Sequence, residues 1–369
     1  MIKQLKSITV NVLAGANIAI VLLMLAVGFS HRFSPADWAV LGWAGLTFPF
    51  FLLLNLGFLV FWVMFHWRKA WIPLVGFFFV YAPVRIYMPV NQEKEVPDSC
   101  LKIISYNVCA YGGNFKYEDG FGAVYSFLEA QQADIVCLQE DVDSWRRYVV
   151  QRYQKIYPYN DTTVFIRSPR NFNAVGVHTR FPILRKERLP LPSKANGAVA
   201  YYLQLSPADT LLLLNVHLES NHLSSEDRAM YKALLKNGMK GEVKGDTVKA
   251  ESRYLLGKLT DAARKRAPQA ELLHDYIAAH SQYPLLVCGD FNDNPLSYSH
   301  YKVAEGLTDC FTESGRGFGW SYNQNGFFFR IDNILCSSHF EPLKCQVDSK
   351  IDFSDHYPMI CWLKMRDKP

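Results

Sequence analysis

The sequence predicts an α/β domain with mixed β-sheets and outer helices, preceded by N-terminal transmembrane helices. Two observations lead to this fold class. Long uncharged apolar stretches are confined to the first 90 residues. Beyond them, short apolar runs bracketed by Gly, Pro, Asn and Asp alternate with segments of helical periodicity. A chain of 369 residues has room for one large domain together with such a membrane part.

The first 90 residues are expected to form a membrane anchor of two to three helices. Residues 12–29 and 38–65 carry no charge and are long enough to cross a bilayer, so we expect spans at about 10–29 and 38–65. A third span at about 70–90 requires the side chain of Arg85 to reach the membrane–water interface with its charged group. The alternative for all three segments is a buried core helix.

Basic residues that flank the apolar segments predict the orientation, because they remain on the cytoplasmic side. Lys3 and Lys6 precede the first segment, Arg32 alone lies between the first and second, and Arg68 and Lys69 lie between the second and third. With three spans, the chain after about residue 90 lies outside the cytoplasm. If the third segment only dips into the bilayer, that part lies inside. We expect a protein of the inner or plasma membrane with an extracytoplasmic domain.

The net charge of +5 comes from the membrane part. Residues 1–90 hold six of the 39 basic residues and one of the 34 acidic ones, so the rest of the chain is neutral overall. The pI of 8.6 therefore reflects charge beside the membrane more than a nucleic-acid-binding surface. The eight cysteines contain no C-x-x-C pair, which argues against a zinc or redox motif, although Cys100, Cys310 and Cys345 could form a bridge in an oxidising compartment.

After a polar linker at 91–98, residues 99–369 are expected to form the main domain. Helical periodicity occurs at 124–132, 225–239 and 247–280. A helical insertion at about 222–268 is basic, with eleven Lys and Arg between residues 228 and 266. It is either a solvated helical face or an arm that rests on anionic lipid or on a polyanionic substrate.

Polar side chains recur where the apolar runs end. These residues are Asn107, Glu140, His217, Asp290, Asn292, Asp332, Asp355 and His356. A carboxylate or imidazole in such a place must be solvated, paired or bound to metal, because burial alone is costly. Glu140 could instead be a helix N-terminal charge and His217 a core histidine. Asp293 and Asn294, which precede Pro295, are expected to be turn residues.

The segments around these residues resemble the endonuclease/exonuclease/phosphatase superfamily of metal-dependent phosphoesterases. Six motifs appear in the family's order across about 99–365, which is nearly the whole soluble part. They are "SYNV" (105–108), "LQE" (138–140), "NVHL" (215–218), "GDFN" (289–292), "RIDNI" (330–334) and "SDHYP" (354–358). The resemblance implies a four-layered α/β sandwich of two packed mixed sheets flanked by helices, with the site at one edge.

By analogy with the family, Glu140 is the main ligand of a Mg²⁺ ion, with Mn²⁺ as an alternative, and Asn107 and Asp355 assist it. Oxygen ligands suit such hard cations, which neutralise the charge of a phosphoester. Some DNA-repair members carry an acid two residues after the first motif Asn, where this chain has Cys109. This difference argues against close kinship with abasic-site nucleases.

The resemblance also implies the catalytic roles. Asp290 orients or deprotonates the attacking water, and Asn292 donates a hydrogen bond to the developing phosphorane. His217 and His356 hold phosphate oxygens or transfer a proton, and Asp332 fixes the tautomer of His356. The division of base and acid among Asp290, His217 and His356 stays open.

Three further residues are candidates for substrate binding. Trp320 and Tyr322 lie in a Gly-aromatic stretch that often precedes the family's Asp-containing strand, so they either line the substrate mouth or pack at its rim. Asn173, like Asn171 and Asn196, is a candidate contact.

The expected function is that of a membrane-anchored, divalent-metal-dependent phosphoesterase that uses activated water. Its substrate is either a nucleic acid or a phospholipid or small phosphodiester; the neutral domain and the membrane tether favour the latter. The alternative is a non-catalytic binding or scaffold protein on the same fold, which is disfavoured because every motif acid and histidine is present.

Overall fold

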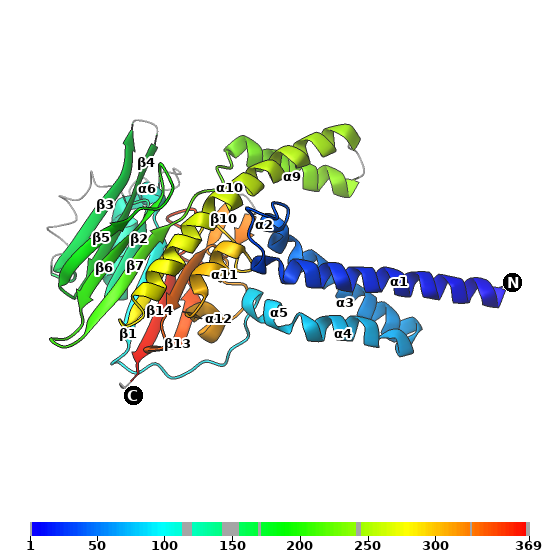
Figure 1. Cartoon of the computed structure of the whole chain (residues 1–369), viewed down its shortest axis with the longest axis horizontal. Coiled ribbons are helices and arrows are strands. Elements are labelled where there is room, and N and C mark those ends of the chain that lie inside the picture. The colour runs from blue at the N-terminus through cyan, green and yellow to red at the C-terminus, as the bar shows by residue number, and fades with distance from the viewer. Residues whose placement is uncertain are drawn as a thin grey trace.

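The structure, a computed structural model, describes residues 2–112, 120–141, 155–168, 171–240, 245–324 and 327–366. The N-terminal helices project from one side of a sheet-rich body (Figure 1). In chain order these helices are α1 (Ile2–Gly28), α2 (Leu41–Ala44), α3 (Phe48–Phe65), α4 (Trp71–Phe79) and α5 (Tyr81–Tyr87).

Two helices in the described part of the chain are long and apolar enough to cross a membrane. They cover Gln4–Gly28 and Leu41–Phe65, close to the first two expected spans. The third expected span corresponds to a bent pair, Trp67–Phe79 and Tyr81–Tyr87, with an angle of 58° between its parts, which is either one broken span or a re-entrant loop. Pro83 in α5 removes a backbone donor, and Val80 leaves the helical region with a ψ of 12° at the break.

A buried polar network joins the apolar helices. Trp62 Nε1 donates to Asn17 Oδ1 at 2.9 Å, and Asn17 Nδ2 donates to Asn55 Oδ1 at 3.2 Å. Asn55 Nδ2 in turn donates to the carbonyl of Pro73 at 3.0 Å. Hydrogen bonds between buried polar side chains help to determine how apolar helices associate.

The body contains two six-stranded sheets, and each of them mixes parallel and antiparallel pairs. The first, in spatial order, is β13 (Phe340–Val347), β14 (Met359–Met365), β1 (Leu101–Asn107), β2 (Ile135–Gln139), β4 (Asn171–Thr179) and β3 (Tyr159–Ser168). The second is β5 (Ile183–Leu189), β6 (Gly197–Gln204), β7 (Thr210–His217), β8 (Leu285–Asp290), β12 (Asp332–Cys336) and β9 (Thr308–Asp309). A small hairpin joins β10 (Tyr322–Gln324) to β11 (Phe327–Phe329).

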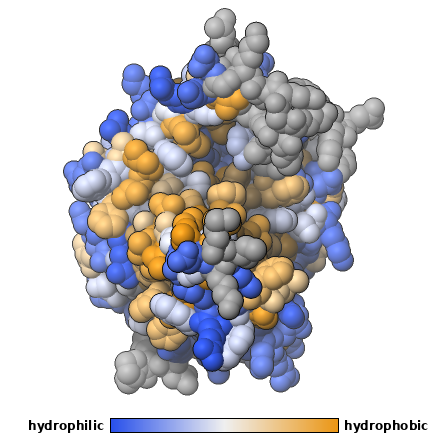
Figure 2. Space-filling view, turned by 90° about the vertical axis from the view of Figure 1, so that its right-hand side faces the viewer, coloured by the Kyte–Doolittle hydropathy of each residue, from blue (hydrophilic) through white to orange (hydrophobic). Residues whose placement is uncertain are grey.

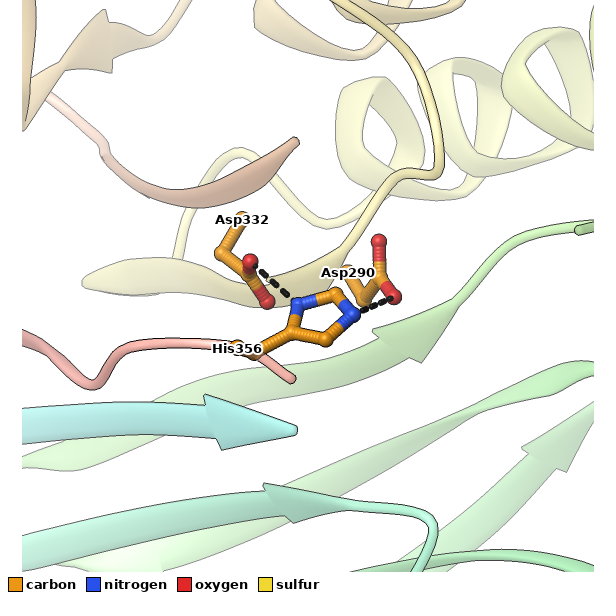
Figure 3. A group of neighbouring side chains, drawn as sticks. All are labelled: Asp290, Asp332 and His356. Atoms are coloured by element: carbon orange, nitrogen blue, oxygen red, sulfur yellow. Dashed lines mark hydrogen bonds and ion pairs between the residues drawn. The ribbon is translucent and has the colours of Figure 1, made fainter. Parts of the chain in front are cut away.

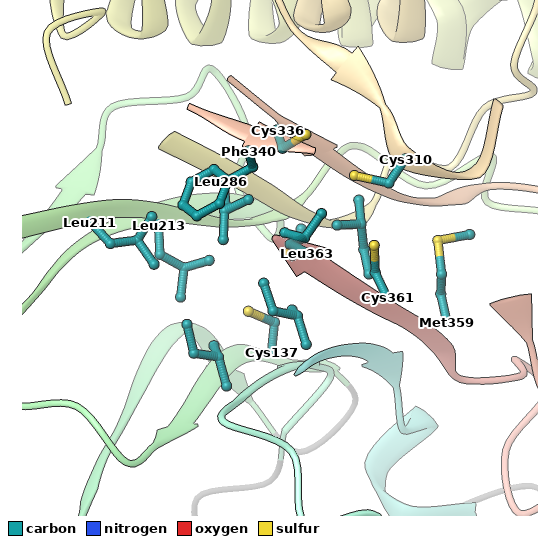
Figure 4. Packing of buried hydrophobic residues seen from close by; sticks show 14 of the residues in the cluster. Cys137, Leu211, Leu213, Leu286, Cys310, Cys336, Phe340, Met359, Cys361 and Leu363 are labelled. Atoms are coloured by element: carbon teal, nitrogen blue, oxygen red, sulfur yellow. The ribbon is translucent and has the colours of Figure 1, made fainter. Parts of the chain in front are cut away.

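The two sheets pack face to face, and helices cover their outer faces. Alternation along a strand directs every second side chain to each face, so Ile103 and Cys137 meet residues such as Leu213 and Leu286 between the sheets (Figure 4). The outer face of the first sheet packs on α7 (Gly120–Gln131). The outer face of the second packs on α10 (Gly245–Ala279). The predicted four-layered sandwich is confirmed.

The remaining helices are short or lie in the predicted insertion. They are α6 (Cys109–Gly112), α9 (Ser225–Lys240), α11 (Tyr298–Ala304) and α12 (Cys310–Ser314). The insertion thus consists of α9 and the first part of α10, which continues past residue 268 onto the second sheet. All eight cysteines are free, including Cys100, Cys310 and Cys345, so the structure contains no bridge between them.

The N-terminal part packs directly on the body. A Cβ placed on Gly45 would lie 2.6 Å from the carbonyl oxygen of Leu296, so only glycine allows this approach. Met24, Phe48 and Val80 form one buried cluster with Leu296. This contact places the ends of three apolar helices against the loop that follows β8.

Candidate active site

Four of the predicted residues meet because the strands that carry them end at one edge of the two sheets. In the second sheet His217 of β7 pairs with Asp290 of β8, and Asp290 pairs with Asp332 of β12. In the first sheet Asn107 ends β1. The carboxyl ends of neighbouring parallel strands share an edge, where the fold leaves room for a site.

An amide connects the two sheets at this edge. Asn107 Nδ2 donates to Glu140 Oε1 and to Asp290 Oδ2, each at 3.1 Å. Its oxygen accepts the backbone N–H of Cys109 at 3.0 Å. Asn107 therefore directs its nitrogen, not its oxygen, at the carboxylates. In this orientation the amide holds Glu140 and Asp290 in place, and the ligand role expected for Asn107 stays a prediction.

Glu140 has a left-handed backbone. Its φ of +56° costs a residue other than glycine about 1–3 kcal/mol, and such strain persists where the surrounding structure holds it. The side chain is one-third exposed and faces the cavity described below. Burial raises the pKa of Glu140, the Asp355 carboxylate raises it further, and the hydrogen bond from Asn107 opposes both.

His356 is held between two aspartates (Figure 3). Its Nδ1 lies 2.8 Å from Asp332 Oδ2, and its Nε2 lies 3.7 Å from Asp290 Oδ2. Burial alone would lower the pKa of His356, but the carboxylates of Asp332 and Asp290 raise it to about 10. The ring is therefore an imidazolium near neutral pH. The expected contact between Asp332 and His356 is present.

His217 lies on the other side of Asp290. Its Nε2 is 3.7 Å from Asp290 Oδ2 and 4.0 Å from Glu140 Oε1, while its Nδ1 is 3.1 Å from Asn173 Oδ1. Burial lowers the pKa of His217, partly offset by the Asp290 carboxylate. Asn173 thus contacts His217 and lines the same cavity, so the structure places it in the site.

Asp290 lies at the centre of the cluster and is 1 % exposed. Burial, and next the neighbouring Asp332 carboxylate, raise the pKa of Asp290 to about 6, while His356 and His217 oppose the shift. A buried carboxylate with this pKa is ionised at neutral pH and can still accept a proton.

The loop after β8 fixes the second predicted amide. The backbone N–H of Asn292 donates to Asp290 Oδ1 at 2.7 Å, and its side-chain Nδ2 donates to the carbonyl of Leu218 at 3.0 Å. Asn294 Oδ1 accepts the N–H of Leu296 at 2.9 Å, which is the turn expected there. Asp293 does more than turn the chain: it pairs with Arg266 Nε at 3.1 Å, and both residues are buried.

A cavity of about 520 Å³ opens over these side chains. Glu140, Asn173, His217, Asp290, Asn292, Tyr322, Asp355 and His356 line it. The Tyr322 ring packs on His356 with the centroids 5.1 Å apart. Trp320 lines a separate cavity of about 370 Å³ and stacks on Phe318 at 5.0 Å.

Two oxygen-rich groups could hold a divalent cation. Within the described part of the chain, Asp290, Asp332 and His356 offer ligand atoms that all lie within 4.8 Å of one another. Both nitrogens of His356, however, already face carboxylates. Glu140 and Asp355 form the alternative pair; each is partly exposed to the cavity, and the charge of Asp355 acts on Glu140. Their donor set, oxygen alone, fits a hard cation better.

Several residues that support the site were not predicted. Ser321 Oγ accepts the backbone N–H groups of Ile331 and Asp332, each at 3.0 Å. Ser354 Oγ donates to the carbonyl of Asn107 at 2.8 Å. Ser354 begins the "SDHYP" motif and could have been included for that reason; Ser321 carries no comparable signal.

A four-layered sandwich with carboxylates, amides and imidazoles gathered at one edge defines a class of phosphoester hydrolases. The chain belongs to the Endonuclease/Exonuclease/phosphatase family, whose sequence profile matches residues 104–356. Members of this family hydrolyse phosphoester bonds and are generally dependent on divalent metal. A second profile, of a domain of unknown function, matches residues 10–87. No curated protein matches the sequence.

Solved structures share the fold at low sequence identity. A humanized TDP2 of D. rerio is 16% identical with a TM-score of 0.50, covering 73% of this chain and 100% of its own. The human Nocturnin catalytic domain is 17% identical with a TM-score of 0.50, covering 72% and 94%. A family protein from Bacteroides thetaiotaomicron is 17% identical with a TM-score of 0.51, covering 73% and 99%.

Proposed function

We propose that this protein is an integral membrane phosphoesterase that hydrolyses its substrate with a water activated at Asp290 and with a bound Mg²⁺ or Mn²⁺ ion. One observation carries the proposal. Asp290 lies within hydrogen-bond or ion-pair distance of Asn107, His217 and His356 on the floor of a cavity. A family fold alone would not require these side chains to converge.

Glu140 and Asp355 would hold the cation, since both carboxylates are partly exposed to the cavity. Asn107 would orient Glu140 through its amide nitrogen. A divalent cation supplies positive charge that neutralises a phosphoester oxygen.

The remaining side chains would accept the proton of the attacking water and bind the phosphate. Asp290 is held by Asn107 and by the N–H of Asn292, so one carboxylate oxygen is positioned to accept a proton from water. His356, fixed by Asp332, would contact the phosphate with its Nε2. An amide NH₂ has two donors, and Asn292 commits one of them to Leu218, which leaves the other for a phosphate oxygen.

The N-terminal part would anchor the protein through three passes. Gly28 near the end of α1 lies close to Phe48 at the start of α3 and to Pro83 in α5, and Phe48 packs in a cluster with Leu296 of the body. Each apolar segment therefore has one end near the body. Lys6, Arg68 and Lys69 lie toward the other ends. Basic residues stay cytoplasmic, so this arrangement supports an extracytoplasmic catalytic domain.

The proposed activity can be tested with the full chain in detergent. We expect Mg²⁺-dependent hydrolysis of bis-p-nitrophenyl phosphate, loss of turnover in EDTA, and loss in Glu140→Ala and His356→Ala. Glu95→Ala, an exposed acid of the linker, is the matched control. If wild type shows no metal-dependent turnover above the two variants, the enzymatic function is wrong and a binding protein on the same fold is favoured. A reporter fused after residue 369 tests the side of the membrane.

A further inference from the structure

The cavity over the site has two chemically different halves. Its floor is the polar cluster around Asp290. Another part of its lining, here called the apolar wall, consists of Trp43, Leu46, Leu223, Leu255, Leu256 and Leu259. Small-molecule sites commonly combine an apolar lining with a few placed polar groups, and the apolar side then receives an apolar part of the ligand.

The apolar wall belongs partly to the N-terminal segment. Trp43 and Leu46 lie in and just after α2, which packs on α10: a Cβ placed on Gly42 would lie 2.8 Å from the Cβ of Ala263. Gly45 is held against Leu296 in the same way. Both contacts need glycine, so the backbone of the segment lies directly on the body. The membrane part therefore completes the cavity as well as carrying the anchor.

The position of α2 also puts the cavity at the bilayer surface. The second apolar span, Leu41–Phe65, begins with the residues that line the cavity. The end of a spanning helix lies at the boundary between hydrocarbon and water. Viewed from the side on which the helices project, hydrophobic side chains gather over the middle of this face (Figure 2). If this span crosses the bilayer, the cavity lies where a lipid could enter it from the membrane.

The charges of the lining argue against a nucleic acid strand. Among the described residues, the acidic side chains of the lining are Asp227, Glu140, Asp290, Asp293 and Asp355, and the basic ones are Arg228 and Arg266. Arg266 is already paired with Asp293, and Lys258 pairs with Asp227 from outside the lining. Binding of a nucleic acid strand depends on several free Lys or Arg for its phosphates, whereas a single headgroup needs few.

We propose that the substrate is a membrane amphiphile, whose phosphoester lies at Asp290 and whose hydrocarbon chain lies against the apolar wall of the cavity. This inference rests on the proposed phosphoesterase function and adds the substrate class. Leu46 and Leu259 determine specificity for the hydrocarbon chain, because one comes from the N-terminal segment and the other from α10, both line the cavity, and neither belongs to the polar cluster.

The test uses alkyl p-nitrophenyl phosphates with methyl, hexyl and decyl chains, below their micelle concentrations, and the full chain in nanodiscs. Each methylene removed from water favours binding about fourfold. We expect kcat/KM to rise at least about tenfold from the methyl to the decyl ester. Leu46→Asn and Leu259→Asn should lower this decyl-to-methyl ratio at least about threefold. Leu184→Asn, at an exposed leucine of β5, is the matched control and should keep the wild-type ratio.

The outcomes separate this inference from the proposed function. A decyl-to-methyl ratio of kcat/KM near one in wild type would contradict an amphiphilic substrate. A ratio unchanged in both variants would contradict it too, since partition into nanodisc lipid affects every variant equally. Faster hydrolysis of a single-stranded oligonucleotide than of the decyl ester would also overturn it. Failure to hydrolyse any of the esters would instead contradict the proposed phosphoesterase function.

A binding measurement tests the apolar part of the site independently of turnover. Decyl phosphate with a terminal diazirine should label peptides that contain residues 41–47 and 255–259. Unlabelled decyl phosphate should compete for this labelling and methyl phosphate should not. Labelling of the other apolar helices that does not respond to competition reports only contact with the bilayer. If residues 41–47 show only labelling that does not respond to competition, the proposed binding site is contradicted.

Discussion

Asp332 Oδ2 lies 2.8 Å from Nδ1 of His356, and the two residues come from the start of β12 and the segment just before β14, in different sheets. The pair therefore joins the two sheets across the site edge. The other ring nitrogen of His356 faces Asp290, which lines the cavity. The orientation of the imidazole therefore depends on Asp332, which does not line the cavity.

Asp332→Asn is expected to lower kcat for bis-p-nitrophenyl phosphate about 100-fold, with KM changed less than about threefold. The amide keeps the shape of the carboxylate but does not stabilise the charged imidazolium, and positioned acid–base groups contribute on this scale. Asp275→Asn on the exposed surface of α10 is the control. An equal fall in both variants, or a change in KM alone, would contradict a positioning role for Asp332.

Removal of metal should abolish turnover, and Mg²⁺ or Mn²⁺ should restore it. Glu140→Gln should raise the Mg²⁺ concentration for half-maximal activity at least about tenfold, because a ligand carboxylate is lost. Titration of activity with metal after EDTA treatment measures this shift. If Glu140→Gln gives the wild-type curve and Asp332→Asn shifts it instead, the cation binds in the Asp290, Asp332 and His356 group.

Arg266→Met is expected to lower the free energy of unfolding by about 3–5 kcal/mol, because Asp293 would be left as an unpaired buried charge. Arg266 also donates to the carbonyl of Glu219 and to Asn221 Oδ1, each at 3.0 Å. Arg264→Met, an exposed neighbour on α10, should cost less than about 0.5 kcal/mol. Denaturant unfolding of the two variants in detergent provides the comparison, and equal stabilities would show that the pair contributes nothing.

Glu219 should make stability depend on acid pH. Hydrogen bonds from His222 and Ser193 lower the pKa of Glu219 to about 2, from an ordinary value of 4.5. A depressed folded pKa stabilises the protein above pH 4.5, and this contribution is lost as the pH falls toward 2. Glu219→Gln should therefore lower the thermal midpoint at pH 7. The free energy of unfolding should fall by at most about 3 kcal/mol.

The difference in thermal midpoint between Glu219→Gln and wild type should shrink between pH 4.5 and pH 3, which differential scanning fluorimetry at both values can measure. A constant difference across this range would mean that Glu219 acts through packing and not through its charge.

The sequence predicted the fold and the residues of the site edge, because the motifs lie at strand ends and strand ends are local features. Asn107, Glu140, His217 and Asp290 each follow an apolar run directly. The resemblance to the family and the sandwich are confirmed. The roles given to these residues stay predictions, and Asn107 turns its nitrogen, not its oxygen, toward the carboxylates.

Contacts between distant segments could not be predicted. Arg266 looked like one more basic residue on a solvated helix, and its partner Asp293 like a turn residue, because nothing local shows that α10 crosses the loop after β8. Trp43 and Leu46 looked like ordinary membrane residues for the same reason. Trp320 shares its stretch of sequence with Tyr322, but the chain directs the two into different cavities.

The packing of Gly45 against Leu296 sets an order for biosynthesis. The ribosome delivers the N-terminal helices first, and domains form as their segments emerge. The residues around Gly45 then lack their packing partners until α10 and the loop after β8 have been made. Only a nearly complete chain can close the space beside Asp290, so under the proposed function a product truncated before residue 296 would be inserted in the membrane but inactive.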